Sequence, residues 1–168
     1  MLKNGKLYEK EIGTELLTRS FDPNYQWYYS GIGLNEFSIP IEATSRHFAS
    51  TTANGKLIGY ISYQIDQSTY AALNLGIISF DMGNPEFIKD VRKVIRAIFE
   101  RHGMNRLEFF VYADSPHLRG YRKLIKRFGG HEVGTLHDTT RLSDGKLHDT
   151  VIFEIMAEDY KHVMKKRV

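Results

Sequence analysis

Residues 70–113 read YAALNLGIISFDMGNPEFIKDVRKVIRAIFERHGMNRLEFFVYA, and this stretch decides the fold class. Tyr70–Phe80 is apolar on both faces near its end, which indicates a central strand covered on both sides. The following segment, to about His102, has apolar residues at spacings of three and four, which predicts an amphipathic helix. Arg106–Ala113 alternates apolar and polar residues as a strand does. A strand, a crossover helix and a second strand predict one parallel βαβ step with a right-handed crossover.

The loop before this helix has the sequence Asp81-Met82-Gly83-Asn84-Pro85. Asn84 is suited to cap the helix and Pro85 to be its first residue. Free backbone N–H groups and the positive end of the helix dipole can hold a phosphate there, and Gly83 lets the backbone approach a ligand closely. The helix start is therefore a candidate phosphate site.

Antiparallel strands precede the βαβ step. Arg46–Thr52 and Lys56–Asp66 read as strands joined by Asn54-Gly55, which favours a tight hairpin turn because both positions tolerate positive φ. Together with the strand that opens the βαβ step they form an antiparallel meander. Nearer the N-terminus, Leu7–Ile12 is compatible with a first strand and Thr14–Phe21 with a short helix.

A second helix and a hairpin follow the βαβ step. Asp114 or Ser115 is suited to cap this helix, and Gly129-Gly130 to end it. The strands Glu132–Leu142 and Leu147–Met156 then form the closing hairpin. The predicted order from residue 7 onward is ββββαβαββ, an α/β fold.

The composition is that of one globular domain spanning residues 1–168. The chain has a 42% hydrophobic content, enough for a core, and no stretch near the roughly 20 apolar residues of a membrane span. The N-terminal residues lack the apolar segment of a signal peptide, so we expect a cytoplasmic protein that does not bind membranes. There is no cysteine, which excludes disulfides, thiolate metal sites and a cysteine nucleophile.

Neither the charge nor the histidines single out a function. The net charge is +3, with basic residues concentrated in Arg119–Arg127 and Lys161–Arg167. Solvated helix faces are the interpretation we favour; a phosphorylated ligand would also suit them, whereas nucleic-acid binding is not expected. None of the seven histidines has metal-site spacing, so no metal is predicted. The aromatic residues Tyr25, Trp27, Tyr28 and Tyr29 either pack within a helix or loop, which we favour, or line a ligand cleft.

The element order over roughly residues 46–156 resembles the GCN5-related N-acetyltransferase (GNAT) superfamily. The resemblance depends on the meander, the βαβ step, the closing hairpin and the segment Asp114-Ser115-Pro116-His117-Leu118-Arg119-Gly120-Tyr121-Arg122-Lys123. The family segment often begins with Asn and contains Tyr before a Lys; here Asp114 replaces the Asn, while Tyr121 and Lys123 match. The resemblance implies a mixed central sheet with helices on both faces.

The family binds acyl-CoA between the two parallel strands, which are splayed apart. This implies a cofactor-binding set of Ile78, Ser79, Phe80, Gly83, Asn84, Asp114, Ser115 and Leu118. The family loop that holds the pyrophosphate reads Arg/Gln-x-x-Gly-x-Gly/Ala, and this chain departs from it. One Gly survives and the basic residue is missing; Pro85 removes a donor and Glu86 adds repulsion, so the loop is degenerate.

The implied reaction is attack of a primary amine on the thioester carbonyl of acetyl-CoA in a ternary complex. The oxyanion needs a backbone N–H, expected near Ile78 or Ser79, and Tyr121 is the expected proton donor to the leaving thiolate. Asp81 is the first choice of base, with His47 and Glu36 as alternatives.

The predicted function is therefore N-acetyl transfer to an amine of a small molecule or a protein. The alternative is a catalytically degenerate GNAT-like domain that binds a ligand or partner without turnover. The sequence does not decide which amine is the acceptor or whether the chain forms a homodimer.

Overall fold

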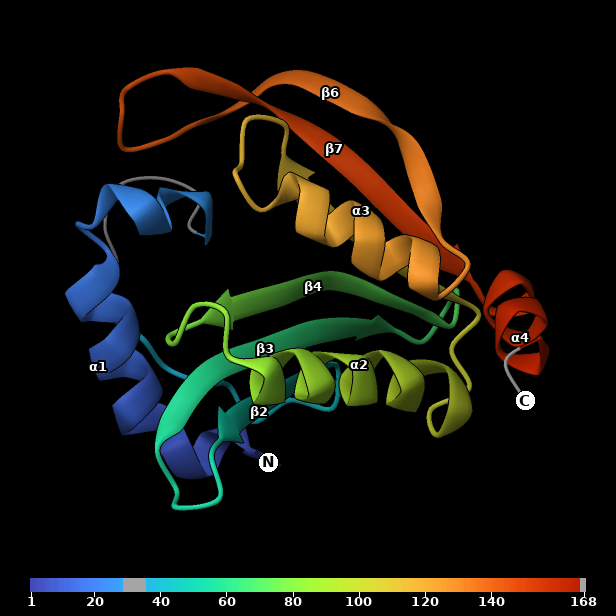
Figure 1. Ribbon diagram of the computed structural model, residues 1–168, viewed down its shortest axis with the longest axis horizontal. Helices are drawn as coiled ribbons and strands as arrows, with labels where there is room; N and C mark the ends of the chain where they lie inside the picture. The colour runs from blue at the N-terminus through green and yellow to red at the C-terminus, as the bar shows by residue number, and fades with distance from the viewer. Residues whose placement is uncertain (29–35, 167–168) are drawn as a thin grey trace.

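The computed structural model describes residues 1–28 and 36–166. One seven-stranded sheet has the order β1-β2-β3-β4-β5-β7-β6 (Figure 1). The strands are β1 Leu2–Asn4, β2 Ser45–Thr51, β3 Leu57–Asp66, β4 Ala71–Ser79, β5 Arg106–Tyr112, β6 His131–Arg141 and β7 Leu147–Met156. The helices are α1 Glu9–Arg19, α2 Pro85–Glu100, α3 Leu118–Arg127 and α4 Ala157–Lys165, with short 3-10 helices η1 Gly5–Tyr8 and η2 Pro23–Tyr28.

The predicted meander and parallel step are confirmed. Strands β2, β3 and β4 pair antiparallel in sequence order, and β4 pairs with β5 in parallel. Helices cover both faces: α2 and α3 pack with one buried cluster, while Ile12 and Leu16 of α1 belong to the other. The mixed sheet with helices on both faces is therefore confirmed.

The N-terminal prediction was wrong. Leu7–Ile12 is no strand: its first residues lie in η1 and the rest in α1. Ile12 and Leu16, four residues apart, are both buried on one helix face, and this helical spacing decides the segment. The first strand is instead Leu2–Asn4, whose Leu2 pairs with Ser50.

Helix α4 was not predicted. It is amphipathic, and its Tyr160 stacks on Phe99 with 4.6 Å between ring centroids. No helix in residues 1–28 and 36–166 is long and apolar enough to cross a membrane.

Both predicted helix starts can be compared with the structure. Asn84 caps α2, because its side chain accepts a hydrogen bond from the backbone N–H of Glu86 at 2.9 Å, and Pro85 is the first helical residue. Helix α3 begins at Leu118, later than predicted. Ser115 caps the turn before it instead, with Oγ accepting from the backbone N–H of His117 at 3.2 Å.

The sheet splits between β4 and β5. In the described chain these strands pair only at Ala71 with Arg106 and at Ala72 with Leu107. Beyond that point β4 continues to pair with β3, and β5 with β7, so the two halves of the sheet diverge toward the carboxyl ends of β4 and β5 (Figure 1). The facing edges of β4 and β5 are consequently left for other partners.

Candidate functional site

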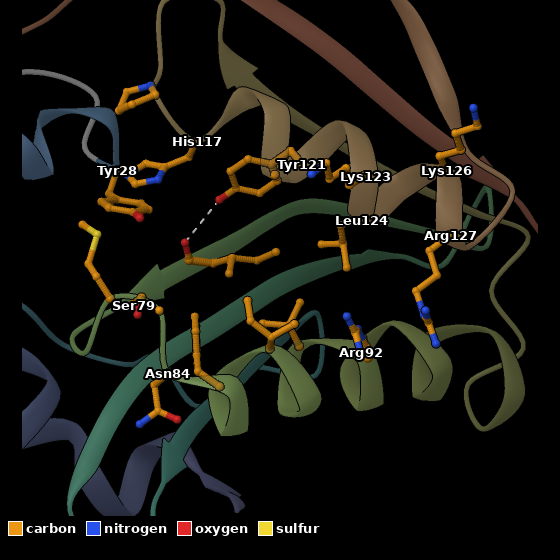
Figure 2. A pocket seen from close by; sticks show the side chains of 18 residues that line it. Tyr28, Ser79, Asn84, Arg92, His117, Tyr121, Lys123, Leu124, Lys126 and Arg127 are labelled. Atoms are coloured by element: carbon orange, nitrogen blue, oxygen red, sulfur yellow. Dashed lines mark hydrogen bonds between the residues drawn. The ribbon is translucent and has the colours of Figure 1, made fainter.

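A cavity of about 830 Å³ lies between α2 and α3, over the gap where β4 and β5 separate. Figure 2 shows the side chains of the 18 residues that line it. They come from η2, the end of β4, the first half of α2 with the loop before it, and α3 with the turn before it: Tyr28, Ile77, Ser79, Met82, Gly83, Asn84, Phe87, Ile88, Val91, Arg92, Pro116, His117, Gly120, Tyr121, Lys123, Leu124, Lys126 and Arg127.

The backbone of β4 presents polar groups to this gap. The N–H of Phe80 donates to the carbonyl of Ile58 at 2.9 Å, so by the alternation of an antiparallel ladder Ile78 faces β3. Ile77 and Ser79 then face the opposite side. Their carbonyls confirm this, because Ile77 O accepts from the Tyr121 hydroxyl at 3.3 Å and Ser79 O from the Tyr25 hydroxyl at 3.1 Å. The N–H groups of Ile77 and Ser79 therefore point toward the gap as well.

Four of the sequence-predicted residues meet in the cavity wall: Ser79, Gly83, Asn84 and Tyr121. The side chains of Ile78 and Phe80 do not, because they pack with α1 on the other face of the sheet. This follows from strand alternation, which sends neighbouring side chains to opposite faces.

The other three predicted cofactor contacts have different surroundings. Leu118 is in the core. Ser115 is buried and holds the turn before α3. The carboxylate of Asp114 lies 3.3 Å from the Nδ1 of His148. None of the three lines the cavity, so their contact with a cofactor stays a prediction.

The three predicted bases are not in the cavity wall. The Asp81 carboxylate accepts a hydrogen bond from the side-chain amide of Asn84 at 3.0 Å, which braces the loop before α2. His47 Nδ1 is 2.6 Å from the Tyr60 hydroxyl and lines a separate cavity beside β1 and β2. Glu36 is exposed.

His117 lines the cavity and was missed as a candidate base. Its ring stacks on Tyr28 with 5.4 Å between centroids, and its buried Nε2 has no hydrogen-bond partner among the described residues. Burial lowers the pKa of His117, which favours the neutral imidazole with an available lone pair. The one available signal was that His117 precedes Tyr121 by four residues, a spacing that puts two side chains on one helix face.

Tyr121 is the central polar group of the wall. Its ring packs against Phe109 at 5.8 Å, and Figure 2 shows its hydroxyl directed at Ile77 of β4. Burial, and secondarily Tyr28, raises the pKa of Tyr121 far above its usual value. The hydroxyl therefore stays protonated and acts as a hydrogen-bond donor.

The aromatic residues of η2 close the open end of the split sheet. Tyr25 bonds to β4 through Ser79 O, while Trp27 contacts His148 of β7 edge-on at 5.4 Å. Tyr28 lines the cavity, and burial raises its pKa to about 12. The cluster thus both packs and lines a cavity; Tyr29 lies outside the described residues.

The cavity wall carries four cationic side chains: Arg92, Lys123, Lys126 and Arg127. None of them forms an ion pair with a carboxylate in the described chain, whereas neighbouring Arg122 bonds Glu132 at 2.6 Å. Figure 2 shows Arg92 and Arg127 at the end away from Tyr28 and His117. The cavity is thus aromatic at one end and cationic at the other, and no cluster of metal-binding side chains occurs in the described residues.

No protein-family model matches the chain, and no curated protein is significantly similar to it in sequence. Solved structures do match. A mutant of the spermidine N-acetyltransferase SpeG from Vibrio cholerae has a TM-score of 0.73 and 15% identity, covering 95% of this chain and 96% of that one. The chain has the GNAT fold. A “putative acetyltransferase” has a TM-score of 0.60 and 22% identity, covering 75% of this chain and 64% of that one.

These structural matches confirm the resemblance to the GNAT fold that the sequence indicated. Because the identities are 15% and 22%, they establish the fold alone. The reaction has to be argued from the residues of the cavity.

Proposed function

We propose that residues 1–168 form one acyltransferase domain that moves an acetyl group from acetyl-CoA to a primary amine by direct attack in a ternary complex. The observation that carries this proposal is the cavity in the split sheet, where the Tyr121 hydroxyl lies beside the free edge of β4. An extended amide chain such as the pantetheine arm suits the N–H and C=O groups of Ile77 and Ser79, because it can pair with them as a strand does.

The proposed chemistry needs a base that takes a proton from the amine and an acid that gives a proton to the leaving thiolate. An N–H of Ile77 or Ser79 stabilises the oxyanion as the amine nitrogen attacks the thioester carbonyl. The new C–N bond forms, the C–S bond breaks, and Tyr121 protonates the departing thiolate.

His117 is the proposed base in place of Asp81. An amine has a pKa near 10 and must lose a proton before or during attack. His117 lines the cavity with an unpartnered Nε2, whereas the Asp81 carboxylate is turned toward Asn84. The proton passes from the amine to His117 and then to solvent, and Tyr121 recovers its own proton from solvent.

The acceptor is proposed to be a small cationic amine. The neighbour SpeG is named for spermidine. Here the exposed residues Asp114 and Asp144 flank His148, which contacts Trp27. Carboxylates next to an aromatic side chain favour a cationic ligand.

A thiol-release assay tests this function. Purified protein is given acetyl-CoA and a panel of primary amines, spermidine first, and free CoA is measured against a reaction without amine. Amine-dependent release supports the proposal. The absence of both release and a thermal shift at millimolar acetyl-CoA would refute it.

The alternative is a domain that binds acyl-CoA without turnover. The observation in its favour is the degenerate loop before α2: residues 81–86 include Asp81 and Glu86 and no basic residue. Its signature would be thermal stabilisation by acetyl-CoA, about 2.7 kcal/mol at a hundredfold excess over Kd, with no thiol release for any amine.

A further inference from the structure

We propose that the phosphates of the acyl donor are held by Arg92 and Arg127 across the cavity, and not by the start of α2. This inference rests on the proposed function. It concerns where the charged end of the donor binds and which side chains bind it.

The start of α2 has few donors left for a phosphate. Pro85 has no N–H. The N–H of Glu86 already donates to the Asn84 side chain at 2.9 Å, and the N–H of Asn84 donates to the carbonyl of Asp81 at 3.1 Å. Two carboxylates also stand at this helix end: Glu86 repels a phosphate, and Asp81 is only partly offset by Lys56, whose Nζ lies 4.0 Å from it. The usual advantage of a helix N-terminus for a phosphate is therefore reduced here.

The opposite end of the cavity has the donors that the α2 start lacks. Arg92 comes from the middle of α2, and Arg127 faces it from the last turn of α3 (Figure 2). The helix dipole of α3 gives a structural reason for a cation at Arg127. It gives none for Arg92, whose position in mid-helix has no such compensation.

Arg92 carries the strongest sign of a missing partner. Its Nε is buried and has no hydrogen-bond partner among the described residues. A buried donor left without a partner is unfavourable, and a phosphate oxygen satisfies it with a strong, charge-assisted bond. Lys123 and Lys126 line the same wall and add positive charge without a carboxylate partner within the described chain.

The proposal is tested by calorimetry on the intact protein with acetyl-CoA and with a phosphate-free probe, S-acetyl-N-acetylcysteamine. The variants are Arg92→Gln, Arg127→Gln and Glu86→Gln. The matched control is Lys89→Gln, which removes an exposed cation of α2 outside the cavity wall. We expect Arg92→Gln to weaken acetyl-CoA binding about tenfold or more, and Lys89→Gln and Glu86→Gln to change it by no more than about twofold.

Phosphate recognition predicts a further difference between the two probes. Arg92→Gln should leave the affinity of the phosphate-free thioester unchanged. The affinity for 3′,5′-ADP, which has phosphates and no thioester, should be weakened by Arg92→Gln as the affinity for acetyl-CoA is.

Three outcomes would overturn the inference: unchanged acetyl-CoA affinity in Arg92→Gln and Arg127→Gln, equal weakening of both thioesters, or several-fold tightening in Glu86→Gln. The last result would place the phosphates at the α2 start. Wild-type protein that binds no acetyl-CoA would instead refute the proposed function, so the two failures are distinguishable.

Discussion

Replacing Tyr121 by Phe removes one hydroxyl and keeps the ring that packs against Phe109. The hydroxyl makes a 3.3 Å hydrogen bond to Ile77 O, at the long end of the range, so its loss should destabilise the fold by about 1 kcal/mol or less. For a chain of this size that is a fall in Tm of at most about 2–4 °C. Catalysis should suffer more: loss of the proton donor to a thiolate of pKa near 8.5 predicts a fall in kcat of about 10–10³-fold.

Tyr25→Phe is the matched control for Tyr121→Phe. Tyr25 also donates its hydroxyl to a β4 carbonyl, Ser79 O at 3.1 Å, but its side chain does not line the cavity. Both variants should therefore lose similar stability, while only Tyr121→Phe loses kcat with acetyl-CoA affinity unchanged. The assay is steady-state thiol release with spermidine or whichever amine proves active, with Tm and Kd measured alongside. Equal kcat in the two variants, or a drop that simply follows Tm, would show that Tyr121 has only a structural role.

Three further perturbations follow from the structure. His117→Gln should remove the rise of kcat/KM with pH that a neutral imidazole base gives, as measured in a pH–rate profile. Burial lowers the pKa of His117 below 6.5, so as pH falls the unfolded chain binds this proton before the folded chain does. The free energy of unfolding of the wild type should therefore decrease as pH drops below 6.5, and should decrease less in the variant. An unchanged profile would argue against the base. Asn84→Ala should cost about 1 kcal/mol through loss of the α2 cap, measured by urea unfolding, and no change would mean that the cap is dispensable. Gly130→Ala would put a Cβ against the Ile125 side chain and 2.6 Å from the carbonyl oxygen of Glu154, and should destabilise the fold by about 1–3 kcal/mol. Gly134→Ala, on β6 with open space around it, should change stability little, and equal melting curves for the two variants would contradict this packing.

The sequence was sufficient to predict an element wherever the spacing of residues within that one segment decides its structure. The stripe in α2 with Asn84 before it predicted that helix, and Asn54-Gly55 predicted the hairpin of β2 and β3; both elements are confirmed. Of the two turn residues only Gly55 has a positive φ, of 86°. The first strand failed because Leu7–Ile12 is too short to separate alternation from helical spacing without knowing that Ile12 and Leu16 share a buried face.

The candidate site depended on the tertiary structure. Residue type and the family segment singled out Tyr121 from the sequence, and the cavity does contain it. Asp81 was chosen for its place at the end of a strand, and only the hydrogen bond to Asn84 shows that its carboxylate is turned to the loop. His117 had no comparable signal, since its stacking on Tyr28 joins segments about 90 residues apart in the chain.

The sequence by itself determined the order of the elements from β2 to β7 and the parallel step, because these are encoded in spacing along a few turns or strands. Only the tertiary structure decided that β4 and β5 part after Ala72 and Leu107, and that the gap brings Arg92 opposite Arg127 and His117 beside Tyr28. Strand separation depends on how α2, α3 and η2 pack over the sheet, and no local periodicity records that packing.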